Sequence, residues 1–285
     1  TTKFSKTTVN PRIAIKYELT PSLILRANVG TGFRAPYGFS EDLHLCSGSP
    51  RVWKSSNLKG ERAISYNLSA DYYAKKYQFS INIFRTNLKD KIQFSPADDE
   101  VKKFGYSYQW ENVDDAYVQG VELGAKANLF RNFNAGINWT FNQGKFKHER
   151  ADWSDPNDET VKEFPQRLQY AKDSRNISRF PAMTGDIDLD YTPGTWTFSL
   201  TSSLQGKMYI DYNSEDDGAT SKIKKTNTFM IFNCRAAKRF GTCTVYAGAK
   251  NIFSYIQDEK HTDDAAFMYA PVYGATWYVG LSVKL

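Results

Sequence analysis

Histidine is the residue type in this sequence best suited to acid–base or metal chemistry, and the three histidines are widely separated. His44 and His148 are 104 residues apart, and His261 follows after a further 113 residues. Nucleophilic hydrolysis needs a nucleophile, a base and an orienting group within hydrogen-bond reach of one another, and the sequence holds no G-x-S-x-G motif. We therefore predict that the chain is not an enzyme and has no catalytic residue.

Cysteine thiols offer a second kind of chemistry, and the three cysteines fall in two settings. Cys46 could be a metal ligand, a free thiol or half of a disulfide to a residue outside this chain. Cys234 and Cys243 flank a turn at Gly241-Thr242, which pairs Cys243 with Phe240. Residues of a strand are about 3.3 Å apart, so Cys234 lies too far along the ladder for a disulfide. We interpret Cys234 and Cys243 as inert residues on the apolar face of their strands.

Acidic and aromatic side chains in the polar connections are the candidate binding groups. Four acidic residues lie close together in the sequence between residues 152 and 159 and could coordinate a hard cation. They lack the spacing of an EF-hand, so we interpret them as part of a solvated loop. The aromatic side chains could stack on a flat ligand or pack the connections against one another, and the sequence leaves both open. The acidic residues are Asp152, Asp155, Asp158 and Glu159, and the aromatic residues are Trp53, Tyr106, Tyr108, Trp110 and Trp153.

The composition limits the class of protein that can position these groups. The 285 residues are 41% hydrophobic and 15% aromatic, with a mean hydropathy of −0.56. These values exclude a disordered chain and a disulfide-stapled mini-protein, and no apolar run approaches the length of about 18 residues that a membrane helix needs. A transmembrane β-barrel fits, because its strands place an apolar residue only at every second position. The net charge of +6 is spread along the chain, so nucleic acid is not the expected partner.

Strict alternation of apolar and polar residues predicts the elements of the fold. Between Ile64 and Tyr72, for example, apolar side chains occupy every even position and polar side chains every odd position. Eleven such strands are predicted, and few segments suggest a helix. The strands begin near Pro11, Leu23, Arg62, Tyr77, Ala116, Phe133, Pro181, Trp196, Phe229, Cys243 and Ala275.

The connections between these strands alternate between short and long. Tight turns follow the odd-numbered strands, and long polar loops follow the even-numbered ones, at roughly residues 37–60, 95–115, 145–180, 214–227 and 258–274. A meander of this kind gathers its long loops at one end, as outer-membrane barrels do, whereas a Greek-key sandwich has no reason to segregate them. We predict an all-β, antiparallel up-and-down transmembrane β-barrel with aromatic side chains at the membrane interfaces.

The odd number of strands has a geometric consequence. In a meander of 11 strands the first and last strands run in the same direction, so the sheet cannot close on itself in antiparallel fashion. Doubling 11 gives 22, the number used by outer-membrane transporters with a plugged lumen. No signal peptide is recognisable at Thr1, so the chain starts after processing or within a longer protein. We expect residues 1–285 to form the C-terminal half of a barrel of about 22 strands.

Several motifs resemble the signatures of TonB-dependent outer-membrane receptors. Phe33-Arg34-Ala35-Pro36 and the following Asn57-Leu58-Lys59-Gly60-Glu61 are similar to the family's GFRAP and NLKPE sequences. Gly120-Val121-Glu122 resembles its N…GvE strand, and Asn251-Ile252-Phe253 resembles the NLF of its penultimate strand. The terminal residues 280–285 resemble its assembly signal, although Leu285 stands where Phe or Tyr is usual, and Gly60 stands where Pro is usual.

The resemblance implies an active transporter in the outer membrane of a Gram-negative cell, with the long loops extracellular. Such a protein would bind a metal chelate (a siderophore, haem or cobalamin) at those loops and import it, with no cofactor or resident metal of its own. The implied partners are the N-terminal half of the barrel, a plug domain outside this chain, the TonB-ExbB-ExbD energy-transducing complex and outer-membrane lipids including lipopolysaccharide, with a surface lipoprotein as a further candidate. An oligosaccharide or peptide importer with a lipoprotein lid, and a passive porin, are the alternatives.

The resemblance also locates the candidate site. His44 lies between the two N-terminal motifs, where haem receptors carry a ligand histidine, and imidazole can bind haem iron axially. The same motifs occur in siderophore and cobalamin receptors, so haem is one option among three. The predicted ligand-binding residues are His44, Trp53, Tyr106, Tyr108, Trp110 and Trp153. The lumen-facing cations are Arg12, Lys16, Arg26, Lys126, Arg235 and Lys250. We expect most of them to pair with plug or barrel carboxylates such as Glu18, Glu122 and Asp186, and a minority to guide an anionic ligand.

Overall fold

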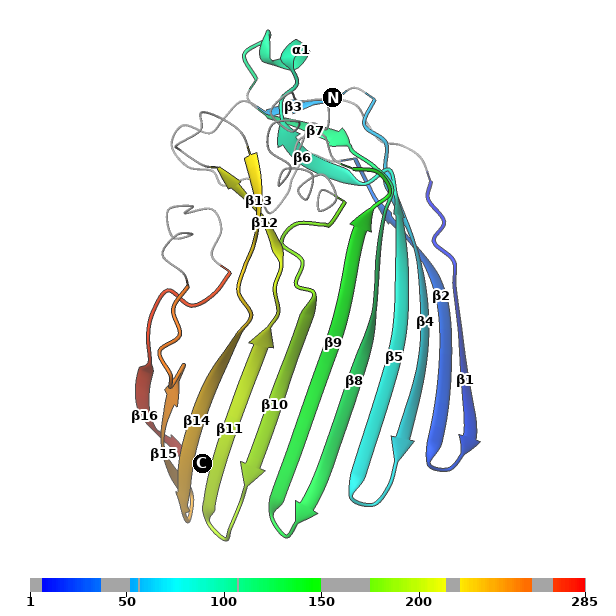
Figure 1. Cartoon of the computed structure of the whole chain (residues 1–285). Coiled ribbons are helices and arrows are strands. Elements are labelled where there is room, and N and C mark those ends of the chain that lie inside the picture. Colours follow the sequence, from blue (N-terminus) through cyan, green and yellow to red (C-terminus); the bar gives the residue numbers. More distant parts are fainter. Residues whose placement is uncertain are drawn as a thin grey trace, which may run out of the picture.

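The computed structural model describes residues 7–36, 52–55, 57–106, 108–149, 175–213, 221–257 and 269–284. Its main element is an antiparallel sheet of 11 strands that follow one another in sequence order (Figure 1). The strands are β1 (Arg12–Thr20), β2 (Leu23–Arg34), β4 (Glu61–Tyr73), β5 (Tyr77–Lys89), β8 (Ala116–Phe130), β9 (Phe133–Phe146), β10 (Met183–Tyr191), β11 (Trp196–Gln205), β14 (Phe229–Phe240), β15 (Cys243–Lys250) and β16 (Thr276–Val283). The sheet curves like part of a barrel wall.

The number and the positions of these strands confirm the prediction from periodicity. Each strand begins within two residues of its predicted start, and the tight turns lie together at one end of the sheet (Figure 1). Asn132, Gly194 and Gly241 have φ angles of +67°, +61° and +59°. This left-handed backbone lets a short turn reverse the chain without splaying the strands. In three of the tight turns, therefore, one residue supplies the left-handed backbone that the turn needs.

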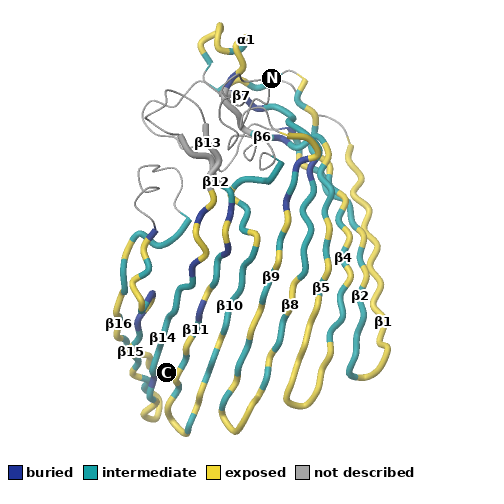
Figure 2. Tube along the Cα trace, in the orientation of Figure 1, coloured by how far each residue is buried: buried dark blue, intermediate teal, exposed yellow. Residues whose placement is uncertain are grey.

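The two faces of the sheet differ in polarity and in exposure. In β4 the even-numbered residues from 62 to 68 are exposed and the odd-numbered ones are half-buried, an alternation that recurs in other strands (Figure 2). The pairing of the strands keeps apolar residues on the same side across the sheet. One row of successive cross-strand partners consists of Ala27, Leu68, Ile83, Val121 and Phe141. We call this apolar, exposed side the outer face and the polar side the inner face.

Two smaller sheets lie beyond the long-connection end of the main sheet (Figure 1). In the first, β7 (Tyr108–Asn112) pairs in parallel with β3 (Val52–Lys54) and antiparallel with β6 (Ile92–Pro96). The one-turn helix α1 (Asp99–Lys102) follows β6, and the Asp98 carboxylate caps it by accepting a hydrogen bond from the Val101 N–H. The second sheet pairs β12 (Tyr209–Asn213) with β13 (Ser221–Lys225). The sequence analysis placed β3, α1, β7 and β13 within long polar loops and did not predict either small sheet.

The buried apolar residues gather mainly where the first small sheet meets the main sheet. Ile92, Ala97, Trp110, Ala116 and Phe146 are all buried, and Ala116 and Phe146 are cross-strand partners at the ends of β8 and β9. The Glu61 carboxylate of β4 accepts a hydrogen bond of 2.9 Å from the Ile92 N–H of β6. The small sheet is thus packed and hydrogen-bonded to the main sheet.

Cys234 and Cys243 lie where the sequence placed them. Cys243 pairs with Phe240 across the turn, whereas Cys234 pairs with Ala249 farther along the ladder, and both thiols are free. Of the helices within the described ranges, none has the length and apolar character that would let it cross a bilayer.

Candidate ligand-binding surface at the long-connection end

Two of the predicted ligand-binding aromatics come together beside α1. The rings of Trp53 on β3 and Tyr106, which follows α1, have centroids 5.1 Å apart at an interplanar angle of 65°. Trp53 is 36% exposed, so part of its indole faces solvent. Edge-to-face pairs of this kind are favourable, and this one offers an aromatic surface to a flat or apolar ligand.

The small sheet fixes the position of this pair. Trp53 is the cross-strand partner of Gln109 on β7, and the Gln109 side chain is buried. Its Oε1 accepts a hydrogen bond of 3.4 Å from the Asp98 N–H, and its Nε2 donates one of 3.0 Å to Glu111. Gln109 therefore links the strand beneath Trp53 to the cap of the helix that precedes Tyr106.

Trp110 lies in a different environment from Trp53. Its exposed fraction is 3%, and its cross-strand partners are Lys54 on β3 and Phe94 on β6. The indole is therefore part of the interior of the small sheet rather than of an open surface. The side chain of Tyr108 and the whole of His44, Cys46, Trp153, His261 and the acidic cluster Asp152, Asp155, Asp158 and Glu159 lie outside the described residues.

His148 is the one histidine within the described residues, and it is hydrogen-bonded to Asp114. Its N–H donates to Asp114 Oδ2 at 2.6 Å, and its ring Nδ1 lies 3.1 Å from Asp114 Oδ1. Desolvation raises the pKa of Asp114, but hydrogen bonds from His148 and from the Asp115 N–H outweigh it and hold the pKa below the ordinary 3.8. His148 thus ties the end of β9 to the segment before β8.

Two of the family-like motifs pack against each other at the end of β2. A Cβ on Gly60 would lie 2.3 Å from the Phe33 ring, so the ring rests directly on the glycine. Arg34 Nη1 lies 3.8 Å from Glu61 Oε2, and the Leu58 N–H donates to the Ser55 carbonyl after the Asn57 turn position. Ala35 and Pro36 complete the segment, and Pro36 is buried. These residues shape the junction between the main sheet and the loops.

The remaining motif residues also serve the architecture. A Cβ on Gly120 would lie 2.3 Å from the Phe141 carbonyl and 2.7 Å from the Phe84 ring. Glu122 on the inner face accepts a hydrogen bond of 2.9 Å from Asn82. Phe253 is exposed and makes an edge contact of 5.3 Å with Phe232.

Two asparagines have roles that motif matching did not assign. The Asn112 amide donates to the Lys59 and Asp90 carbonyls at 3.0 and 2.7 Å, and its Oδ1 accepts from the Lys59 N–H at 2.7 Å. Asn251 is buried and has a φ of +51°. Its amide donates to the Tyr255 and Tyr273 carbonyls at 2.7 and 3.1 Å, and its Oδ1 accepts from the Tyr255 N–H at 2.9 Å. Both fix loop backbone at the strand ends.

The inner face carries the charges that the sequence predicted, with partly different partners. Lys16 forms an ion pair of 2.6 Å with Glu18, and Arg26 pairs with Asp71 of β4. Asp186 accepts a hydrogen bond of 2.8 Å from the Asn138 amide, much as Glu122 accepts one from Asn82. Amides therefore satisfy some carboxylates that we expected to meet cations.

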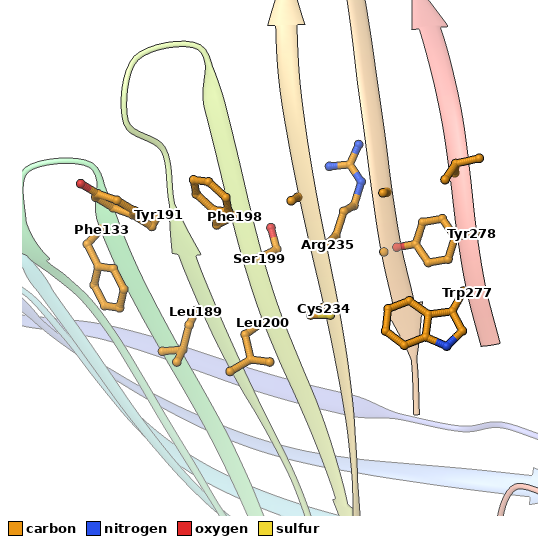
Figure 3. A pocket seen from close by; sticks show the side chains of 14 residues that line it. Phe133, Leu189, Tyr191, Phe198, Ser199, Leu200, Cys234, Arg235, Trp277 and Tyr278 are labelled. Atoms are coloured by element: carbon orange, nitrogen blue, oxygen red, sulfur yellow. The ribbon is translucent and has the colours of Figure 1, made fainter. Parts of the chain in front are cut away.

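A hollow on the outer face is unrelated to this surface. This groove has a volume of about 670 Å³. It lies between the aromatic side chains of Tyr191 and Phe198 on one side and that of Trp277 on the other (Figure 3). Small outward residues such as Cys234 form its floor, and its lining is almost wholly apolar. An apolar groove on this face suits hydrocarbon chains rather than a polar solute. Within the described ranges no group of three or more histidines, cysteines and carboxylates could hold a metal ion.

Comparisons with known proteins agree on one family. The family model described as "TonB dependent receptor-like, beta-barrel" matches residues 1–252. The vitamin B12 transporter BtuB of Photobacterium profundum is 26% identical over 266 residues, which cover 91% of this chain and 36% of the transporter. The ferric enterobactin receptor of Pseudomonas aeruginosa is 27% identical over 151 residues, 47% of this chain and 20% of the receptor.

Solved structures share the fold at lower identity. The unliganded ferric citrate transporter FecA has a TM-score of 0.66 at 19% identity, covering 95% of this chain and 37% of that protein. The copper transporter OprC has a TM-score of 0.64 at 19% identity, covering 95% and 38%. The chain thus spans less than two fifths of the length of each of these four proteins.

Proposed function

Because this chain belongs to the TonB-dependent receptor-like β-barrel family, we propose that it forms the C-terminal half of the barrel of an outer-membrane active transporter. The family consists of outer-membrane receptors, which are transporters rather than enzymes, in agreement with the sequence prediction. Membership also implies a plug domain and an interaction with TonB. We propose that the N-terminal half of the barrel, the plug and the TonB-ExbB-ExbD complex act together with residues 1–285.

The proposed activity is capture and import of a metal chelate: a siderophore, haem or cobalamin. The observation that carries this proposal is the pairing of the exposed Trp53 with the half-buried Tyr106, held beside a folded small sheet at the long-connection end. Aromatic surfaces backed by fixed polar groups are typical of small-molecule sites, and the long-connection end faces the outside in barrels of this architecture. Relatives named for vitamin B12 and ferric enterobactin support the same ligand class.

The other predicted contacts divide into two groups. His44, Tyr108 and Trp153 stay in the proposal as candidate ligand contacts from the sequence, with His44 as the haem ligand if haem is the substrate. Trp110 is 3% exposed, so we propose that its indole supports the small sheet on which Trp53 stands. Import of an oligosaccharide or peptide with a lipoprotein lid, and passive diffusion, remain the competing functions.

Alanine variants of the aromatic pair test the proposal in the full-length receptor. Binding of cyanocobalamin, ferric enterobactin and haemin is measured by tryptophan fluorescence quenching. We expect one of the three to bind the unaltered protein, and Trp53→Ala and Tyr106→Ala each to raise its Kd about ten- to thirtyfold, the usual effect of losing an aromatic hot spot.

Phe104→Ala is the matched control, because Phe104 is 71% exposed and lies two residues before Tyr106 but has no aromatic partner within the described residues. Unchanged binding in Trp53→Ala and Tyr106→Ala, at equal receptor levels, would remove the aromatic pair from the site. Uptake of the bound chelate that continues in cells without TonB would favour a passive porin.

A further inference from the structure

Backbone hydrogen bonds join the tight turns of the main sheet into one row at its lower end in Figure 1. A carbonyl of each turn accepts a hydrogen bond of 2.8 or 2.9 Å from an N–H on the next part of the sheet. The five bonds run from Tyr73 to Ser22, from Asn128 to Lys76, from Thr192 to Asn132, from Arg239 to Thr195 and from Lys284 to Thr242. The turns are therefore fixed to the neighbouring strands.

The charged side chains in this row are all cationic. The row comprises residues 20–22, 74–76, 130–132, 192–195, 239–242 and 284, which contain no aspartate or glutamate. We call its five charged residues the basic turn rim, and all five are exposed: Lys75, Lys76, Arg131, Arg239 and Lys284. The long-connection end differs, because its described cations include ones paired with acids, such as Lys102 with Asp99.

The basic turn rim has no acidic partner within the described ranges. No carboxylate there lies within 4.0 Å of a side-chain nitrogen of the five residues. The carboxylates closest to the turns along their strands are engaged on the inner face: Glu18 with Lys16, Asp71 with Arg26 and Asp190 with the Ser199 hydroxyl. The charge of the rim is therefore left for an anion from outside these residues.

Two cations of the rim lie on the inner side of the sheet. Lys238 is on the outer face, where its Nζ lies 4.8 Å from the centroid of the Trp196 ring. Arg239 is the next residue of the same strand, so alternation places it on the inner face. Lys284 follows the outward, exposed Val283 and is placed inward in the same way. These two side chains face away from the lipid that surrounds the barrel.

The rim is also wide. It extends from the turn between β4 and β5 to the end of β16, and the sheet has nine strands over that distance. Neighbouring strands are about 4.8 Å apart, so the rim is about 38 Å long. One small anion cannot contact cations spread over this length, whereas a polymer with repeated anionic groups can. In outer-membrane barrels the short turns face the periplasm.

We propose that the basic turn rim binds the carboxylates of peptidoglycan, the anionic cell-wall polymer on the periplasmic side of the outer membrane. Lysine and arginine form charge-assisted hydrogen bonds with carboxylates, and the stem peptides of this polymer carry carboxylates at repeated intervals. A layer beneath the barrel can reach Arg239 and Lys284, whereas lipid headgroups surround the outer face. The proposal goes beyond ligand import and does not depend on which chelate is bound.

The test measures how much full-length receptor sediments with insoluble peptidoglycan in detergent at low ionic strength, because salt screens exposed charges. The probes are native peptidoglycan and the same material after its carboxylates are converted to amides. The triple variant Lys75→Gln, Lys76→Gln, Arg131→Gln should bind native peptidoglycan about tenfold more weakly than the unaltered protein. The amidated polymer should bind the unaltered protein about as weakly as the native polymer binds this variant.

Two control variants separate charge at the rim from net charge and from folding. Arg62→Gln, Lys89→Gln, Lys147→Gln removes the same charge at the opposite end of the sheet and should bind like the unaltered protein. Lys75→Arg, Lys76→Arg, Arg131→Lys keeps the charge of the rim and should also bind normally. Equal binding by the two charge-removing variants would overturn the proposal, as would amidated peptidoglycan that binds as tightly as the native polymer.

Lipid is tested as the competing occupant. Phosphatidylglycerol bound to the receptor is counted by native mass spectrometry, and the charge-removing variant of the turns should bind as much of it as the unaltered protein. If that variant loses phosphatidylglycerol but still sediments with peptidoglycan, the rim binds lipid and the proposal is wrong. Neither assay contains a chelate, so failure of this proposal is separate from failure of the transport proposal.

Discussion

Replacing Leu68 by arginine tests the assignment of the two faces most directly. Leu68 is 57% exposed in the isolated chain and lies midway along the apolar outer positions of β4, which run from Ile64 to Tyr72. Four residues separate it from either end, which is about 13 Å along a strand. A tilt of about 40° reduces this to about 10 Å of depth, so Leu68 lies near the middle of an apolar band about 25 Å tall.

The expected loss of stability in Leu68→Arg follows from the depth of Leu68 in the apolar band. An arginine at the midplane of the lipid face of a barrel costs about 2–4 kcal/mol. Asn67 precedes Leu68 but points to the inner face, where its cross-strand partners are Asn28 and Phe84. Asn67→Arg places its charge in the polar lumen and should change the free energy of unfolding by only about 0.5 kcal/mol. The two neighbouring substitutions should therefore differ by at least about 1.5 kcal/mol.

The assay is reversible unfolding of the full-length receptor in lipid vesicles, with guanidinium chloride as denaturant and tryptophan fluorescence as the signal. Unaltered protein, Leu68→Arg and Asn67→Arg are compared at equal lipid composition, and the slope of each transition is checked for constancy. An equal loss of stability in both variants would refute the assignment of the two faces, and a larger loss in Asn67→Arg would show that the faces are reversed.

Two further predictions concern side chains at the long-connection end. Asn251→Ala should lower the free energy of unfolding by about 1–3 kcal/mol, because it leaves loop backbone groups of Tyr255 and Tyr273 without their hydrogen-bond partner; the same guanidinium titration measures it, and an unchanged midpoint would contradict the assigned role. Asp114 has a lowered pKa in the folded protein, so it stabilises the fold above about pH 4, and that contribution is lost as the pH falls through the folded value. Asp114→Asn should therefore lose less stability than the unaltered protein between about pH 5 and pH 3, and an equal loss in both would show that Asp114 makes no such contribution.

The main sheet could be predicted from the sequence because the alternation of apolar and polar residues shows which face of the sheet each residue occupies, and the strand register must keep the residues of one face together. A strand such as β4 shows its outer face through Ile64, Tyr66 and Leu68 alone, and a slip of one residue would turn all three inward. The small sheet could not be predicted in this way. Its strands β3 and β7 are three and five residues long, too short to show a period, and they pair in parallel across more than 50 residues of chain.

The sequence could propose residues for the candidate site, but it could not predict how these residues are arranged. Trp53 and Trp110 are both tryptophans in polar connections, and nothing local distinguishes them. Their different burial arises because β7 is the central strand of the small sheet, with Lys54 on one side of Trp110 and Phe94 on the other. Only the pairing of distant segments separates the exposed indole from the buried one.

The motif residues explain why the family could be identified more readily than the ligand. The Asn112 and Asn251 amides satisfy loop backbone groups where strands end, and Gly120 lets the Phe84 ring approach the sheet. Each of these tasks belongs to the barrel wall, and none of these contacts includes Trp53 or Tyr106. Receptors can therefore keep the same motifs while the loops between them change, and relatives named for vitamin B12 and ferric enterobactin both match this chain. The variants at Trp53 and Tyr106 proposed above therefore test ligand binding, whereas substitutions in the motifs test the barrel wall.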